Sequence, residues 1–108
     1  MLTILPGQLD GLTILALSGE LTIFTAAQAR QEILAHQTAH PDLQLDLAGV
    51  TELDTAGVQL LAWLKREAVR RGAALVFRHH SAPVMEVLDL LKVTQAFGDP
   101  MLLPPAGV

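Results

Sequence analysis

Residues 43–72 constrain the fold of this chain more than any other part of the sequence. The leucines of residues 43–47 alternate with polar residues, and this period of two predicts a β-strand. From about residue 57 to residue 71, apolar residues recur at helical spacing, and Gly72 is typical of a helix end. A strand followed by an amphipathic helix is the building unit of an α/β fold, so we expect that class here.

Similar patterns on both sides of this unit predict the remaining elements. Apolar-rich segments bounded by Gly, Pro or Asp predict strands at residues 1–5, 12–17, 73–77 and, as a short edge strand, 101–103. A Thr-x-x-Gln capping box at Thr25 predicts a helix over residues 25–38. Ser81, followed by proline in the first turn, predicts a last helix with Val84 and Leu88 facing inward.

The alternation of these elements predicts a small mixed, mostly parallel β-sheet of four to five strands, with three to four helices packed on it. The two N-terminal strands would form a hairpin around Asp10-Gly11. The chain has 108 residues and no linker, so we expect one domain over residues 1–103 and a tail over residues 104–108.

Composition narrows the possible functions. The formal net charge of −4 argues against nucleic acid as a partner, because surfaces that bind nucleic acid are usually basic. The sequence has no Cys and shows neither a signal peptide nor a membrane-spanning run, so we expect a cytoplasmic protein without direct membrane insertion. Half of the residues are apolar and only 17% are charged, which indicates an exposed patch that meets a protein partner.

Motifs for catalysis are absent from the sequence. It contains no nucleophile elbow, no glycine-rich phosphate loop and no HExxH pattern. A small hydrolase that uses Glu20 and Asp54 is the alternative from the enzyme class. Two histidine pairs lack a third metal ligand in the pattern: His36 with His40, and His79 with His80. We therefore expect no enzyme activity, no cofactor and no metal.

A lone hydroxyl stands at the start of the helix predicted from residue 57. Asp54 and Thr55 precede this helix, and its first N–H groups and partial positive charge could hold a phosphate on Thr55. The simpler interpretation is that Thr55 caps the helix and Asp54 supports the same end by charge and hydrogen bonding. Both roles are compatible with one position.

The same predicted helix carries the only Trp of the chain on the face opposite its core stripe. Gln59, Trp63, Arg66 and Arg70 share that face at helical spacing. Trp and Arg are enriched in the residues that dominate binding at protein interfaces. We therefore interpret the face as a contact for a partner; the alternatives are a Trp that lies over neighbouring side chains or packs in a homodimer.

Three stretches resemble the STAS domain family, named for sulphate transporters and anti-sigma factor antagonists. Residues 17–21 followed by Thr25-Ala26 resemble the family's Gly-Glu-Leu-Asp segment. Residues 45–50 with Leu53-Asp54-Thr55-Ala56-Gly57 resemble its strand and Asp-Ser-Ser-Gly-Leu signature. Residues 84–97 resemble its final amphipathic helix. The likeness covers nearly the whole chain.

The resemblance implies a stand-alone anti-sigma factor antagonist that acts in transcription regulation by partner switching. It implies that an anti-sigma factor or serine kinase binds the loop at Asp54 and phosphorylates Thr55. Two positions depart from the family pattern: Thr22 replaces an Asp, and Ala56 replaces the second hydroxyl. The residues that we expect to bind the partner are Glu20, Thr22, Asp54, Thr55, Ala56, Gln59, Trp63 and Arg66.

A second branch of the resemblance leads to another function. Stand-alone relatives include the STAS subunit of phospholipid-trafficking ABC transporters, which binds the ATPase and tends to carry a Thr in the motif. On that alternative the same face binds an ATPase, and Thr55 is never phosphorylated.

Overall fold

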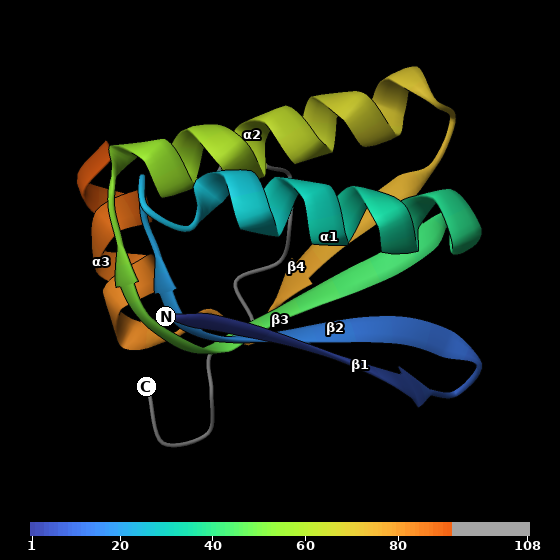
Figure 1. Ribbon diagram of the computed structural model, residues 1–108, viewed down its shortest axis with the longest axis horizontal. Helices are drawn as coiled ribbons and strands as arrows, with labels where there is room; N and C mark the ends of the chain where they lie inside the picture. The colour runs from blue at the N-terminus through green and yellow to red at the C-terminus, as the bar shows by residue number, and fades with distance from the viewer. Residues whose placement is uncertain (92–108) are drawn as a thin grey trace.

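The computed structural model describes residues 1–91 (Figure 1). Within this range the chain forms the strands β1 (Leu2–Leu9), β2 (Leu12–Leu21), β3 (Asp42–Leu53) and β4 (Ala74–Arg78). The helices are α1 (Ala26–Ala39), α2 (Thr55–Arg70) and α3 (Ala82–Leu91). The strand predicted at residues 101–103 and the tail predicted at residues 104–108 lie outside the described residues.

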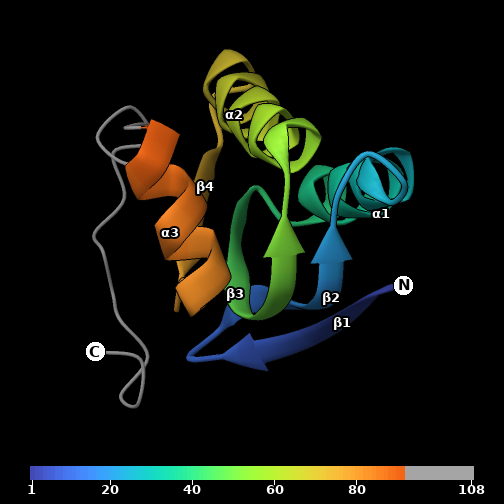
Figure 2. The same cartoon turned by 90° about the vertical axis from the view of Figure 1, so that its left-hand side faces the viewer.

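The strands form one sheet in the order β1-β2-β3-β4. β1 pairs with β2 in antiparallel orientation, whereas β2 with β3 and β3 with β4 are parallel. The helices α1 and α2 connect the parallel strands and lie side by side over the same face of the sheet (Figure 2). The expected fold class, a mixed and mostly parallel sheet with packed helices, is confirmed.

The core lies between this sheet and its helices. Leu15, Leu45 and Phe77 from three neighbouring strands are fully buried, and so are Ile33 of α1 and Leu61 of α2. The predicted inward stripe of α2 is confirmed, because Gly57, Leu61, Leu64 and Ala68 are all buried. Helix α3 packs against β3 with Val84 and Leu88 fully buried, as predicted.

Three strands are longer than the sequence predicted, and β3, expected over residues 43–47, extends from Asp42 to Leu53. β1 does not stop at Pro6 but runs on to Leu9. A proline is tolerated there because β1 lies at the edge of the sheet, where the missing N–H breaks no ladder on a second side. β2 continues past Gly19 to Leu21, with irregular pairing to β3 on both sides of Ser18 and Gly19.

The capping box predicted at Thr25 is wrong. Thr25 precedes α1, but its side chain makes no capping bond to the helix. Instead, its hydroxyl donates to the carbonyl of Glu20 at 2.7 Å and accepts from the N–H of Thr22 at 3.0 Å. The amide of Gln28 donates to the carbonyl of Leu2, at 3.3 Å, rather than turning back to the helix start. The hydroxyl thus shapes the loop after β2.

Candidate functional site

The carboxyl ends of β2 and β3 lie side by side, and this brings together two loops that carry candidate site residues. The parallel register pairs Leu21 with Leu53 at the last residue of each strand. The N–H of Asp54 also donates to the carbonyl of Leu21, at 3.4 Å. The loop that leads into α1 and the loop that leads into α2 therefore start from the same edge, as the parallel pattern predicts.

Asp54 joins these two loops through its carboxylate. One oxygen, Oδ1, accepts from the N–H of Gly57 at 2.9 Å and caps the start of α2. The other oxygen, Oδ2, accepts from the N–H of Ile23 at 2.9 Å, in the loop before α1. A half-buried side chain thus fixes the first turn of one helix and the approach to another.

Gly57 allows the start of α2 to approach β2 closely. A Cβ atom at this position would lie 2.3 Å from the carbonyl oxygen of Leu21 and 2.6 Å from the side chain of Leu53. The carbonyl of Leu21 belongs to β2, which is paired with β3, so it cannot move away from an added Cβ without shifting the sheet. The glycine of the motif is therefore required by space, and it sets the position of the residues before it.

Thr55 is the first residue of α2, and its side chain is exposed. The helix begins two residues earlier than predicted because Asp54, not Thr55, is the capping residue. The alternative in which Thr55 itself caps the helix is therefore wrong. Its hydroxyl is accessible at the positive end of a helix dipole, which is the geometry that stabilises an added negative charge.

Two exposed apolar residues beside Asp54 escaped sequence reasoning. Phe24 is 93% exposed and Ile23 is 68% exposed, in the loop that Asp54 holds. A large apolar side chain left in water so fully favours a contact with another molecule. The hydropathy of the sequence suggests core residues here, and only their place in a loop between a strand end and a helix could have marked them.

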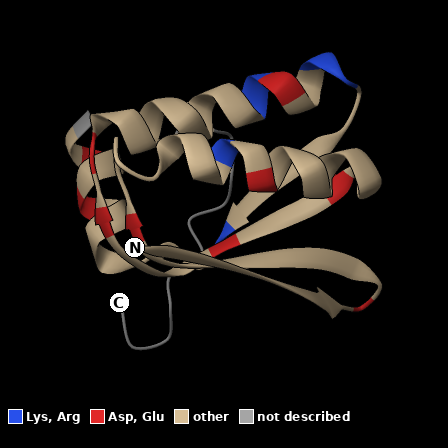
Figure 3. Ribbon diagram, in the orientation of Figure 1, with Lys and Arg blue, Asp and Glu red and all other residues tan. Residues whose placement is uncertain are grey.

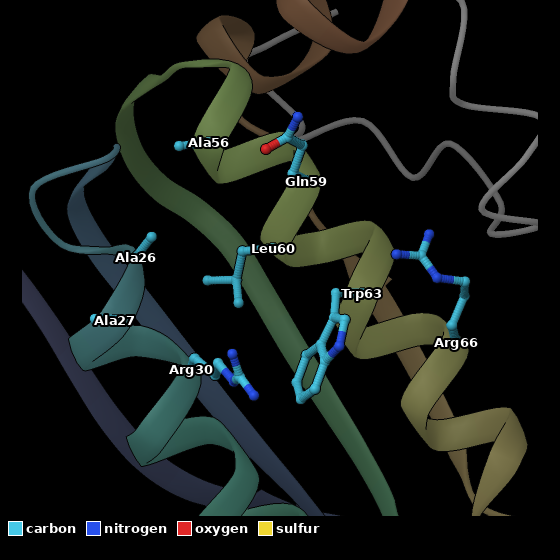
Figure 4. A pocket seen from close by; sticks show the side chains of 8 residues that line it. All are labelled: Ala26, Ala27, Arg30, Ala56, Gln59, Leu60, Trp63 and Arg66. Carbon is cyan, nitrogen blue, oxygen red and sulfur yellow. The ribbon is translucent and has the colours of Figure 1, made fainter.

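A groove of about 560 Å³ runs between α1 and α2. Figure 4 shows Arg30 reaching from α1 toward the ring of Trp63, which projects from α2, with Arg66 on the other side of that ring. The groove brings together four residues that the sequence predicted to bind a partner: Ala56, Gln59, Trp63 and Arg66. Among residues 1–91, the groove is also lined by Ala26, Ala27, Arg30 and Leu60.

The predicted orientation of Trp63 requires a correction. The indole does not point away from the core but is half-buried and packs against the edge of the core cluster. The guanidinium of Arg30 lies 4.2 Å from the centre of its ring, a cation–π contact. The periodicity of one helix places Trp63 relative to the sheet, but it does not reveal that α1 lies beside it.

Glu20 and Thr22 lie near the motif but are already engaged. The N-terminal ammonium group donates to Oε1 of Glu20 at 2.7 Å. Thr22 is only 5% exposed, and its hydroxyl accepts from the N–H of Phe24 at 3.3 Å. The side chain of Thr22 therefore supports the loop that carries Phe24, whereas that of Glu20 holds the N-terminus.

The basic side chains of the described part of the chain are confined to a few elements. Within residues 1–91, the Lys and Arg side chains lie on or directly after α1, α2 and β4, whereas carboxylates occur throughout, including on all three helices (Figure 3). The same residues contain no cluster of three or more His, Cys, Asp or Glu side chains that could hold a metal ion. No helix among them has the length and apolar character needed to cross a bilayer.

Comparison with known proteins matches the whole arrangement to one family. The family model described as the Mlab STAS domain matches residues 7–104. No curated protein matches the chain significantly.

Solved structures share the fold. An anti-sigma factor antagonist from Mycobacterium paratuberculosis is 21% identical, with a TM-score of 0.77 over 98% of this chain and 89% of that one. A proposed anti-sigma factor antagonist from Thermotoga maritima is 15% identical, with a TM-score of 0.78 over 95% and 88%. The antagonist SpoIIAA in its unphosphorylated form is 22% identical, with a TM-score of 0.67 over 96% and 91%.

Proposed function

The chain belongs to the STAS domain family, and from this premise we propose that it is a non-enzymatic cytoplasmic regulator that works by partner switching. Its partner is an anti-sigma factor or a serine kinase, which binds the Asp54–Thr55 segment and the side of α2 that faces the groove. The unphosphorylated form binds the partner, and phosphorylation of Thr55 releases it. The likeness to structures described as anti-sigma factor antagonists supports this class of function.

The observation that carries the proposal is the position of the Thr55 hydroxyl. It is exposed at the first residue of α2, next to the residue that holds the Phe24 loop and the residue that begins the groove wall. A modification there touches both candidate contact surfaces at once. Among the four residues of the Asp-Thr-Ala-Gly motif, Thr55 has the only side-chain hydroxyl.

The physical effect of a phosphate at Thr55 follows from charge. It adds about 1.5 to 2 negative charges and three acceptor oxygens beside the carboxylate of Asp54. The start of α2 stabilises part of that charge, because its N–H groups and dipole favour anions. A partner surface shaped for the neutral hydroxyl would face repulsion and desolvation, and about 1.4 kcal/mol of lost binding energy lowers affinity tenfold.

The proposal is tested by capture of the partner from extracts of the source cells. We expect wild type and Thr55→Ala to recover the same protein, and Thr55→Glu to recover at least about tenfold less of it. Thr51 offers a matched control, because it is also exposed but lies within β3. Thr51→Glu should capture the partner as wild type does. Equal recovery by wild type, Thr55→Ala and Thr55→Glu would exclude the switch.

A second candidate function is that of a constitutive STAS subunit in a phospholipid-trafficking ABC transporter, bound to its ATPase. Thr22 and Ala56 favour it, because both depart from the antagonist pattern. Under this function the captured protein is an ATPase, and Thr55 carries no phosphate in protein purified from its own cells. Phosphopeptide mapping of that protein, together with identification of the captured partner by mass spectrometry, separates the two functions.

A further inference from the structure

The groove between α1 and α2 is lined by both apolar and positively charged side chains. Its lining includes three small residues, Ala26, Ala27 and Ala56. Their short side chains leave space between the helices, next to the ring of Trp63 and the side chain of Leu60 (Figure 4). Small wall residues beside a half-buried aromatic ring give a recess that a side chain from another molecule can enter.

The charge of this groove is opposite to that of the chain. The chain carries a formal net charge of −4, yet the described residues that line the groove include two arginines and no carboxylate. Within residues 1–91, neither Arg30 nor Arg66 forms an ion pair. A positive recess on a negative protein favours an anionic group in the partner.

The next turn of α2 shows the contrast. Arg70 hydrogen-bonds the carboxylate of Glu67 and lowers its pKa, and Arg71 lies 3.5 Å from the same carboxylate. The charge of Arg70 is therefore offset by a hydrogen-bonded carboxylate of the same helix, which Arg71 also contacts. The cations beside the groove keep their charge available, although they lie on the same pair of helices.

Arg30 is already oriented for recognition of a carboxylate. Its guanidinium lies over the Trp63 ring, and a stacked guanidinium keeps its N–H groups in its own plane, free to donate sideways. A carboxylate accepts two such N–H groups in parallel, which makes the contact directional. The stacking therefore reduces the freedom that Arg30 would lose on binding.

We infer that the groove receives acidic side chains of the protein partner, with one Asp or Glu bound by Arg30 on one side of the Trp63 ring and a second bound by Arg66 on the other side. This inference rests on the proposed function, since it names the chemistry of the partner segment that docks on α2. The partner therefore presents an acidic segment whose carboxylates reach the two guanidinium groups while apolar atoms of the segment cover the indole.

The test uses the only Trp of the chain as its reporter. Helical peptides without Trp or Tyr, with two Glu residues one turn apart, are titrated against the full-length protein, and identical peptides with Gln serve as twins. We expect the Glu peptides to change Trp63 fluorescence and to bind at least about tenfold more tightly than their Gln twins at low salt. Arg30→Gln and Arg66→Gln should each remove most of this preference.

Arg70→Gln is the matched control, because it also removes one positive charge from α2, but Arg70 is paired with Glu67 and does not line the groove. It should leave the preference for Glu peptides unchanged. Equal binding of the twins, no binding of either, or an equal loss in Arg70→Gln overturns the inference. Circular dichroism melting checks that each variant is folded.

A second measurement covers a variant that fails to fold. Arg66→Lys and Arg70→Lys retain the charge, and a carbodiimide joins a lysine amine to a carboxylate in contact with it. We expect a cross-link to the Glu peptide at position 66 and none at position 70, mapped by mass spectrometry. If these peptide experiments fail but Thr55→Glu still captures less partner than wild type, only the acidic segment is refuted. If Thr55→Glu captures as much partner as wild type, the phosphorylation switch is refuted.

Discussion

The carboxylate of Asp54 accepts a hydrogen bond from the backbone N–H of Ile23, 31 residues earlier in the chain. The same carboxylate caps α2 through the N–H of Gly57. One side chain therefore fixes the relative position of the exposed Phe24 loop and of Thr55. A partner that reads both features meets them in a fixed arrangement, and disturbance of Asp54 should affect both.

Replacing Asp54 by alanine should destabilise the protein by about 1 to 2 kcal/mol, because the cap of α2 and the bond to Ile23 are lost together. Urea denaturation followed by circular dichroism measures the change. Asp42→Ala is the control, since Asp42 is exposed at the start of β3, and it should change stability by less than about 0.5 kcal/mol. Equal stability of Asp54→Ala and wild type would contradict the bridging role.

Gly57→Ala should cost about 1 to 3 kcal/mol of stability, because the added methyl group would lie 2.3 Å from the carbonyl oxygen of Leu21. The start of α2 must then move away from β2, so partner capture should also weaken. At Gly7 the nearest atom to an added Cβ is 4.0 Å away, and Gly7→Ala should be tolerated. Comparing the melting temperatures of the two variants distinguishes a steric clash at Gly57 from a general effect of replacing glycine by alanine.

Phe24→Ala should leave stability within about 0.5 kcal/mol of wild type, since the side chain is 93% exposed. Its affinity for the captured partner should nevertheless fall about tenfold or more if the ring enters a pocket of that partner. Leu9→Ala is the control, because Leu9 is 52% exposed at the end of β1 and pairs with the first residue of β2, at the opposite end of that strand from Phe24. An unchanged affinity of Phe24→Ala would remove the loop from the binding surface.

Arg30→Gln should shift the fluorescence of the unliganded protein to longer wavelength, because the indole of Trp63 loses the guanidinium that covers it at 4.2 Å. The loss of this contact should cost about 0.5 to 1 kcal/mol of stability. Arg66→Gln makes no such contact with the ring in the described residues and should leave the emission unchanged. Identical spectra of all three proteins would show that the stacking does not persist in solution.

The sequence predicted the fold well because its strongest signals are local. The alternation of leucines in β3 and the helical stripe of α2 depend only on the residues within each element, and both are confirmed. Strand ends were predicted less well. β1 passes through Pro6 because it lies at a sheet edge, and that position depends on the pairing of all four strands.

The candidate site divides along the same line. The motif around Thr55 could be recognised from its order along the chain, and its exposure at the start of α2 agrees with that interpretation. Arg30 and Phe24 could not be recognised in this way. Arg30 belongs to the groove only because α1 packs beside α2, and Phe24 is exposed because Asp54 holds its loop in place. Both facts arise from contacts between distant segments.

Pro6 has a consequence for how this protein meets others of its kind. A sheet with an unpaired outer strand can pair side by side with a strand of another molecule, and repeated pairing leads to aggregates. β1 is such an outer strand, and an imino acid within it leaves a gap in the row of donors that a newcomer would need. Encounters along this border are thereby discouraged, and the helical side of the molecule is left as the better place for recognition.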